Sequence, residues 1–320
     1  MADALISVVM LTYNREQYIS RAIESVLKQT FPAFEFIIVD NGSSDRSLSI
    51  AREYERQDQR ISVVSIPKSS ISAERNQGVR RSRGQFITFL DDDDWMEPDM
   101  LDYLYQLAVE HSAEISLCGS YKVVDGKPYP NCVFQEELVM SPAEAVVMLL
   151  KRKKCNSAMP SKLFARRLLE EIPFCEDSVY DDIAVIYKYF ASATRVAGRG
   201  EPKYYFYRHP GNHSAFTTND ALLTPAQLDE YFAVFRERTA YLSAVLPEIA
   251  DYARYSEWSY QISMCNKIIR NHLTDCREQL AYAVEELSRN KDEFYHSPYI
   301  EEFEREYMRK YILDPGGAAL

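Results

Sequence analysis

The first ninety residues alternate short apolar runs with amphipathic segments, and this alternation constrains the fold more than any other feature. The runs have the length of strands, and the segments between them carry apolar residues at helical spacing. Strands apolar on both faces and joined by helices form βαβ units. The sequence therefore predicts an α/β domain, a mostly parallel sheet with helices on both faces, with strands near 5–11, 34–39, 61–66 and 86–90.

Turn and cap residues predict several element ends. Asn14 is expected to cap the first helix, and Gly84 to end the third as the glycine after its last turn. Asp125-Gly126 is typical of a hairpin turn, and Ser141 begins a capping box that opens a later helix. A further helix is expected over residues 178–190.

The helical pattern from about residue 223 onward differs from the alternating pattern before it. A polar stretch at 217–220 separates the two, so we expect an α/β domain at 1–218 and a helical region at 219–320. The helical region is expected to act as a homo-oligomer interface, an acceptor platform or a membrane-facing surface. The sequence leaves these three open.

Charge and cysteine content narrow the class of protein. The net charge of −11 argues against a nucleic-acid partner. Six scattered cysteines without zinc spacing, no signal peptide and no apolar run of about 20 residues favour a cytoplasmic protein. The basic run at 151–154 allows peripheral contact with a membrane, although its place at a helix end also explains it.

Four aspartates at positions 91–94 directly follow the fourth strand and precede Trp95. Carboxylates gathered at one strand end repel one another unless a cation sits among them, and open α/β sheets bind ligands at that edge. A divalent cation that carries phosphates fits this position. A solvated acidic loop is the alternative.

Four segments, in this order and in these strand contexts, strongly resemble the family-2 glycosyltransferases, which are inverting enzymes with the GT-A fold. The resemblance is specific to about Pro98 and looser to about Ser214. It implies transfer of a sugar from a UDP-sugar donor to a hydroxyl of a saccharide or lipid-linked saccharide in bacterial cell-surface polysaccharide synthesis. The segments are VVMLTYN (8–14), IIVDNGSSD (37–45), RNQG (75–78) and LDDDDW (90–95).

The resemblance also implies roles for residues on the donor side. Thr12 and Tyr13 would contact the base, although Tyr13 is also compatible with the core. Asp40 would accept the base N–H. Arg75 would bind the nucleotide or diphosphate, because its guanidinium matches pairs of oxygen atoms.

Within the tetrad, the resemblance assigns different tasks to each carboxylate. Asp91 and Asp93 form the DxD motif and would ligate Mn²⁺ or Mg²⁺. Asp92 would face the ribose. Asp94 would bond the following backbone and cap the turn into Trp95.

The general base is expected on a second acidic pair. Asp182 aligns with the base of the family, and Asp181 stands where glutamate is usual. Both are also compatible with a helix N-terminus that favours acidic residues. The pair Glu176-Asp177 lies just upstream and keeps the choice open.

The segment after residue 206 looks like the late loop of the family, whose arginine and serine reach the diphosphate. Arg208 and Ser214 are the candidates. His209 or His213 would be either a metal ligand or a surface group.

Two other functions remain open. A nucleotidyltransferase would share the sheet and the metal but needs a glycine-rich phosphate loop, which residues 11–15 do not provide. A non-catalytic scaffold would be expected to have a damaged DxD motif or base, and neither is damaged here.

Overall fold

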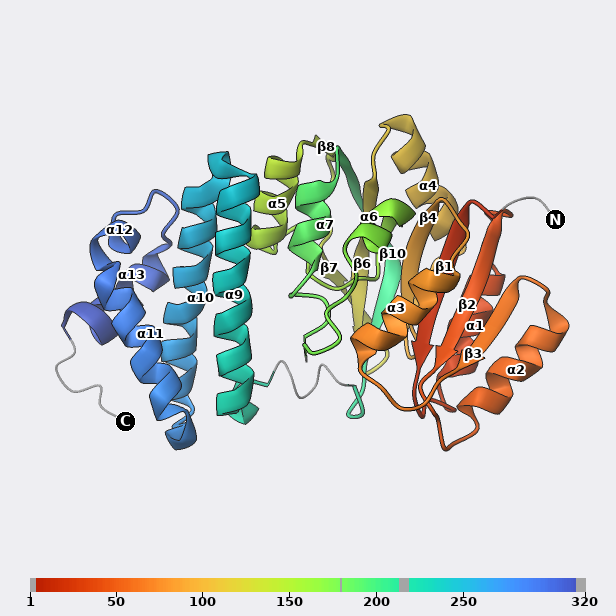
Figure 1. The fold of residues 1–320 in the computed structure, drawn as a ribbon, viewed down its shortest axis with the longest axis horizontal. Coiled ribbons are helices and arrows are strands. Elements are labelled where there is room, and N and C mark those ends of the chain that lie inside the picture. Colours follow the sequence, from red (N-terminus) through yellow and green to blue (C-terminus); the bar gives the residue numbers. More distant parts are fainter. Residues whose placement is uncertain (1–3, 179, 213–218, 315–320) are drawn as a thin grey trace. The chain divides into compact units, whose positions relative to one another are not determined.

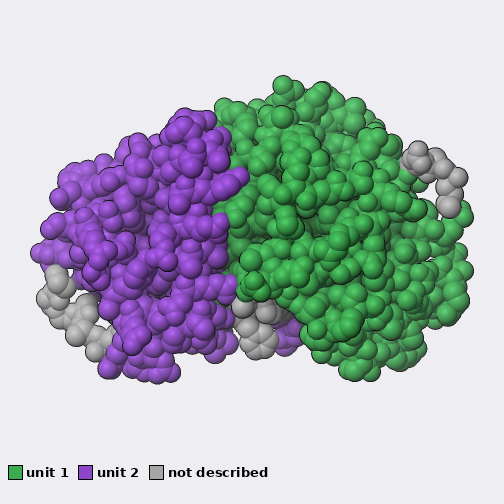
Figure 2. Space-filling model, viewed as in Figure 1, with its two compact units in different colours: residues 1–208 green, residues 209–320 purple. Residues whose placement is uncertain are grey.

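The computed structural model describes residues 4–178, 180–212 and 219–314. The chain divides into two compact units, residues 1–208 and 209–320 (Figure 2). Each unit is described by itself below.

Unit 1 is built on one sheet, whose main path among the described strands is β3-β2-β1-β4-β9-β6-β10-β5, while β7 pairs with β6 and β8 with β10. The strands β3, β2, β1 and β4 can be followed in Figure 1. The first four in this order are parallel, as the sequence predicts. Beyond β4 the sheet is mixed: β9 is antiparallel to β4 and β6, and β10 is parallel to β6. The bounds are β1 Ile6–Thr12, β2 Phe34–Asp40, β3 Ile61–Ser65, β4 Phe86–Asp91, β5 Trp95–Met96, β6 Ile115–Val124, β7 Lys127–Asn131, β8 Glu137–Met140, β9 Lys162–Ala165 and β10 Val196–Arg208.

Helices cover both faces of this sheet. Side chains of β1 alternate between them: Val8 and Met10 join the core cluster that includes α1 and α4, whereas Val9 faces α3. A β-carbon on Gly78 of α3 would lie 2.3 Å from Cγ1 of Val9, so the glycine allows α3 to pack closely on β1. The helices are α1 Ile19–Leu27, α2 Ser47–Gln57, α3 Ile71–Arg81, α4 Met100–Glu110, α5 Pro142–Lys151, α6 Arg166–Glu171 and α7 Ile186–Ser192.

Two of the local predictions are confirmed. Asp125 and Gly126 both have positive φ and join β6 to β7. Ser141 and Glu144 form the reciprocal capping box at the start of α5. Lys154, in the basic run after α5, pairs with Glu136.

Asn14 does not cap the start of α1, and Gly84 does not follow the last turn of α3, as the sequence predicts they would. Helix α1 starts only at Ile19, and Asn14 (φ 53°) instead accepts a 2.8 Å hydrogen bond from the backbone of Ser44. Helix α3 ends at Arg81, and Gly84 has no positive φ. A β-carbon on Gly84 would lie 2.6 Å from the backbone nitrogen of Ser7, so close contact with β1 explains the glycine.

The helix predicted over 178–190 is shorter, because α7 begins at Ile186. The carbonyl of Asp182 accepts hydrogen bonds from the backbone of Val185 (3.2 Å) and Ile186 (2.9 Å), so Asp182 lies in a turn before the helix. Asp182 thus precedes the first turn of α7 and is joined to it through its carbonyl.

Unit 2 is helical in its described part. Helix α10 packs against α9, α11 and α13 (Figure 1). Buried residues between them include Leu242, Ile262, Leu287 and Met308. The bounds are η1 Asp220–Leu222, α9 Pro225–Val245, η2 Pro247–Ile249, α10 Ala250–Arg270, η3 Thr274–Cys276, α11 Arg277–Arg289, α12 Lys291–Tyr295, α13 Glu302–Met308 and η4 Arg309–Leu313. None of the helices described in either unit is long and apolar enough to cross a membrane.

Candidate active site

Strand register brings three of the predicted site residues to one edge of the sheet. Thr12 pairs with Asp40 across β1 and β2, and Leu11 pairs with Asp91 across β1 and β4. Because these strands are parallel, Thr12, Asp40 and Asp91 end side by side at their carboxyl ends.

The last aspartate of the tetrad fixes the turn to β10. The backbone nitrogen of Asp94 donates to the carbonyl of Asp91 (3.1 Å). The Asp94 carboxylate accepts hydrogen bonds from the Tyr204 hydroxyl (2.8 Å) and the Tyr207 backbone (2.7 Å). The sequence predicts that Asp94 bonds the backbone that follows it. Its carboxylate instead bonds to residues of β10, where it has a structural role.

The other three carboxylates are crowded. Asp92 accepts a 3.2 Å hydrogen bond from the backbone of Tyr13, and Nε of Arg15 lies 3.6 Å from Asp92 and 4.0 Å from Asp93. Burial, reinforced by the charge of Asp93, raises the pKa of Asp92 to about 8. Burial also raises the pKa of Asp91 to about 6, although Arg75 opposes the shift. Ionising these carboxyl groups is therefore costly, and a bound cation would lower that cost.

The donor set fits a hard divalent cation. Asp91 and Asp93 offer carboxylate oxygens, which Mg²⁺ and Mn²⁺ prefer, and such sites take their remaining ligands from substrate phosphates and water. A solvated loop is the poorer explanation, because Asp92, Asp93 and Asp94 are all buried.

Arg75 connects this carboxylate group to the second acidic pair. Its side chain is 8% exposed, and its Nε donates a 2.5 Å hydrogen bond to Oδ2 of Asp181. Nη2 of Arg75 lies 3.9 Å from Oδ1 of Asp91. The guanidinium thus stands between Asp91 of the tetrad and Asp181 of the later acidic pair.

The neighbouring Asn76 holds the start of the same loop. Its amide donates to the carbonyl of Phe174 (3.0 Å) and to Oε1 of Glu176 (2.9 Å), and its oxygen accepts from the Phe174 backbone (3.0 Å). Glu176 is therefore engaged in anchoring the loop, whereas Asp177 is exposed. These contacts favour the downstream pair as the source of the base.

Asp182 is half-buried, and its carboxylate accepts a 2.6 Å hydrogen bond from the backbone of Ile183. Burial and the charge of Asp181 raise the pKa of Asp182 above its usual value. A raised pKa suits a group that must take up a proton.

Glu74 is a buried acid at this edge that the sequence patterns did not single out. Its side chain is 3% exposed, and among the described residues its Oε1 makes no hydrogen bond. Burial raises its pKa to about 8. The positive charge of Lys68 lowers this pKa, whereas the negative charges of Asp92 and Asp40 raise it further. In the sequence, Glu74 directly precedes the RNQG segment at 75–78. A search for paired acidic residues does not find it, because it stands alone.

Asp40, like Glu74, is buried and has a carboxylate oxygen without a hydrogen bond among the described residues. It is fully buried, and its Oδ2 accepts from Ser65 (3.1 Å) and from the backbone of Ser43 (3.3 Å). Its Oδ1 makes no hydrogen bond within the described part of the chain. Buried acceptors are normally paired, so these oxygens of Asp40 and Glu74 remain available to a ligand.

Tyr13 stands at the edge of this region rather than in the core, since 41% of it is exposed. The Lys68 ammonium lies 3.0 Å from the centre of its ring. A flat face and a cation are therefore available beside Asp92.

The late loop is only partly described. Arg208 ends β10, with its guanidinium 5.8 Å from the ring of Phe206. Nδ1 of His209 accepts a 3.2 Å hydrogen bond from the backbone of Gly211. Ser214 and His213 lie outside the described residues.

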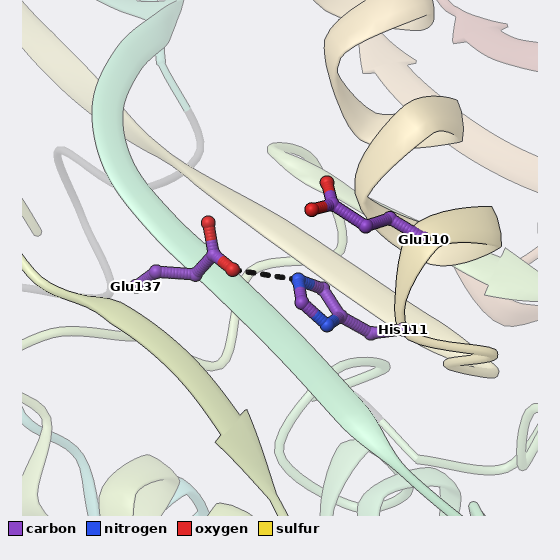
Figure 3. A group of neighbouring side chains, drawn as sticks. All are labelled: Glu110, His111 and Glu137. Atoms are coloured by element: carbon purple, nitrogen blue, oxygen red, sulfur yellow. Dashed lines mark ion pairs between the residues drawn. The ribbon is translucent and has the colours of Figure 1, made fainter.

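A separate group of potential metal ligands consists of Glu110, His111 and Glu137 (Figure 3). Nε2 of His111 lies 2.7 Å from Glu137. Arg199 pairs with Glu137 and, at 3.2 Å, with Glu110. Arg199 pairs with both carboxylates and offsets part of their charge, so ion pairs hold this group together without a metal.

Comparison with known proteins identifies the relatives of this arrangement. The family model described as "Glycosyl transferase family 2" matches residues 7–172. Glycosyltransferase GlyG of Streptococcus pneumoniae is 30% identical over 65% of this chain and 72% of its own length. Glycosyltransferase GlyA of the same organism is 36% identical over 38% of this chain, but the match spans only 17% of GlyA.

A solved structure matches most of the chain. Residues 1–349 of Staphylococcus aureus TarS, in complex with UDP-GlcNAc, superpose with a TM-score of 0.66 at 21% identity. The match covers 96% of this chain and 91% of that one. The fold is therefore the GT-A fold with a helical region after it, as expected.

Proposed function

The chain belongs to glycosyl transferase family 2, and we propose that it moves a sugar from a UDP-sugar donor to an acceptor hydroxyl with inversion and with the help of Mn²⁺ or Mg²⁺. One observation carries this proposal. The crowded carboxylates at the end of β4 are joined through Arg75 to the loop that bears Asp181 and Asp182. A leaving-group site and an acceptor-side base thus stand on either side of one arginine.

On the donor side, Asp40 and Glu74 are proposed to read the base. The free Oδ1 of Asp40 accepts the N3–H of uracil. Glu74 stays protonated below pH 8 and donates to a neighbouring carbonyl of the ring. Thr12 and the face of Tyr13 complete the base site, and Asp92 faces the ribose.

Asp91 and Asp93 hold the metal, and Arg208 and Ser214 assist at the diphosphate. When bound, the cation neutralises the charge that develops on the leaving diphosphate. The raised pKa of Asp91 is consistent with a carboxylate that lacks its counter-charge.

Asp182 removes the proton of the acceptor hydroxyl as the reaction proceeds. The acceptor oxygen forms its bond to the anomeric carbon on the face opposite the diphosphate. The bond from that carbon to the phosphate oxygen breaks, and its electron pair leaves with UDP. The configuration inverts, so an α-linked donor gives a β-linkage.

Arg75 is proposed to position these groups rather than to bind the nucleotide directly. Its guanidinium is buried and already bonded to Asp181. It keeps the loop of Asp182 beside the donor site and offsets the repulsion among Asp91, Asp181 and Asp182.

The acceptor class rests on relatives. TarS is named a poly(ribitol-phosphate) β-N-acetylglucosaminyltransferase, and it is 26% identical over 72% of this chain. By analogy with TarS, we propose that the acceptor of this chain is a hydroxyl of a saccharide or lipid-linked saccharide of the cell surface.

Isothermal titration tests the donor side. UDP should bind at least tenfold more tightly with Mn²⁺ than with EDTA, and equal affinity would contradict the metal-dependent proposal. Hydrolysis and transfer assays with UDP-glucose, UDP-galactose, UDP-GlcNAc and UDP-GalNAc then identify the sugar.

A further inference from the structure

Unit 2 contains a cavity of about 470 Å³ among its described residues, between η1, α10 and α13. A volume of this size is within the range of small-molecule sites. The described residues that line it all lie between 219 and 307, within unit 2.

One wall of the cavity is a polar stripe of α10. The lining residues recur at intervals of three and four, which places them on one helix face. They alternate with the buried residues of α10, so this face points away from the core of unit 2. The stripe consists of Ser263, Asn266, Lys267, Arg270 and, just after the helix, Asn271.

The opposite wall is aromatic. Phe303 and Tyr307 stand one turn apart on α13, with ring centres 5.8 Å from each other. Phe303 is 44% exposed, which places an apolar face at the cavity. Ring faces of this kind pack against the C–H faces of sugars and polyols.

The charge in the cavity is positive, although the unit is acidic. From residue 209 onward the chain has 18 acidic and 11 basic residues, a formal charge of −7. In the cavity, Lys267 is 2.9 Å from Asp220, and Arg270 has no ion pair or hydrogen bond with the described residues. One positive charge therefore remains uncompensated.

The amides offer both kinds of hydrogen-bonding group. Asn266 accepts from the Tyr311 hydroxyl through Oδ1 (2.9 Å), which leaves its NH₂ to donate. Asn271 donates to the carbonyl of Lys267 (2.9 Å), which leaves its oxygen to accept. Hydroxyl groups need such mixed partners.

We propose that this cavity binds a polyol phosphate or sugar phosphate. The phosphate contacts Arg270, whose planar fork suits phosphate oxygens, the carbon chain packs on Phe303, and the hydroxyls bond to the two asparagines. A solvated arginine at a helix end would explain Arg270 alone, but not the facing aromatic wall.

The identity of this ligand as part of the acceptor rests on the proposed function. An anionic polymer held at a second point raises the effective concentration of its hydroxyls, which lowers KM for a polymer without changing kcat. Short acceptors would gain nothing from the cavity.

Binding to the full chain tests the cavity without relying on turnover. In calorimetry with the Asp182→Asn protein and no nucleotide, ribitol 5-phosphate should bind saturably, and ribitol or inorganic phosphate at least fivefold more weakly. Arg270→Ala and Phe303→Ala should each weaken binding at least fivefold. Arg277→Ala removes an exposed arginine outside the cavity and should leave it unchanged.

Three results would overturn the proposal. These are the absence of saturable binding, equal affinity for inorganic phosphate, or unchanged affinity in both cavity variants with native circular dichroism. If UDP fails to bind while ribitol 5-phosphate binds, the proposed transferase reaction is wrong and the cavity stands.

Discussion

Nε of Arg75 donates a 2.5 Å hydrogen bond to Oδ2 of Asp181, 106 residues further along the chain. Asn76 bonds in the same way to Phe174 and Glu176. The two residues of one helix turn therefore fasten the loop that leads to the proposed base. Two residues of the RNQG segment thus contact a loop that lies about one hundred residues later in the chain.

Arg75→Met should destabilise the fold and slow transfer. Removing one partner of a buried ion pair leaves uncompensated carboxylates, so the free energy of unfolding should fall by about 3 kcal/mol. Transfer should fall more than UDP affinity, because the variant displaces the base loop. Urea unfolding and calorimetry measure the two effects.

Arg80→Met on the exposed face of the same helix is the matched control and should differ little from wild type. A stable Arg75→Met protein with full activity would contradict the positioning role.

Asp182→Asn should abolish transfer while leaving UDP binding intact. An acceptor-side base contributes about 10²–10⁴-fold to the rate, and the side chain is proposed to lie away from the nucleotide. The rate of sugar transfer and the Kd for UDP are measured side by side. Asp177→Asn changes an exposed neighbour and should keep its activity; the reverse pattern would move the base upstream.

The positions of the first four strands and the grouping of site residues at their ends were predictable because they follow from periodicity and strand ends. Thr12, Asp40 and Asp91 each close an apolar run, and parallel strands must bring such ends together. The partners of these residues were not predictable. Asn14 carries a strong cap signal, yet tertiary contact with Ser44 decides its conformation.

Burial explains the other differences. Glu74 looks like an ordinary surface acid of a helix, and only packing of α3 against the sheet makes it 3% exposed. Gly84 looks like a helix end, but the approach of β1 requires it. Arg75 also has a protein partner, Asp181, which no sequence pattern indicated because it is remote in the sequence. Long-range contacts of this kind leave no local pattern.

Asp93→Asn should stabilise the metal-free protein and remove its response to metal. Neutralising one of the crowded carboxylates relieves repulsion, so Tm of unit 1 in EDTA should rise by about 2–4 °C, which corresponds to roughly 1 kcal/mol for a unit of this size. Mn²⁺ with UDP should raise Tm of the wild type but not of this variant. Differential scanning calorimetry records both.

Asp94→Asn is the contrasting control. It weakens the bonds to Tyr204 and Tyr207, so its Tm should fall. If Tm of Asp93→Asn falls in EDTA, as Tm of Asp94→Asn should, repulsion is not the dominant effect at Asp93.

Glu74 should make both stability and UDP affinity depend on pH. Its pKa is about 8 in the folded protein and 4.5 in the reference state. The folded state therefore binds a proton that the unfolded state lacks between these values. Its contribution to stability is complete below pH 4.5, declines as pH rises and is lost above about 8. If the protonated form donates to the base, UDP affinity should also fall by up to tenfold per pH unit above 8.

Glu74→Gln tests this directly, because glutamine keeps a donor and cannot ionise. Its UDP affinity should match the wild type at pH 6 and exceed it at pH 9, and its Tm relative to wild type should rise across the same range. Titration of UDP itself is common to both proteins and cancels in the comparison. Glu53→Gln, at an exposed position on α2, should track the wild type. Parallel pH profiles for wild type and Glu74→Gln would remove Glu74 from base recognition, because no other change distinguishes the two proteins.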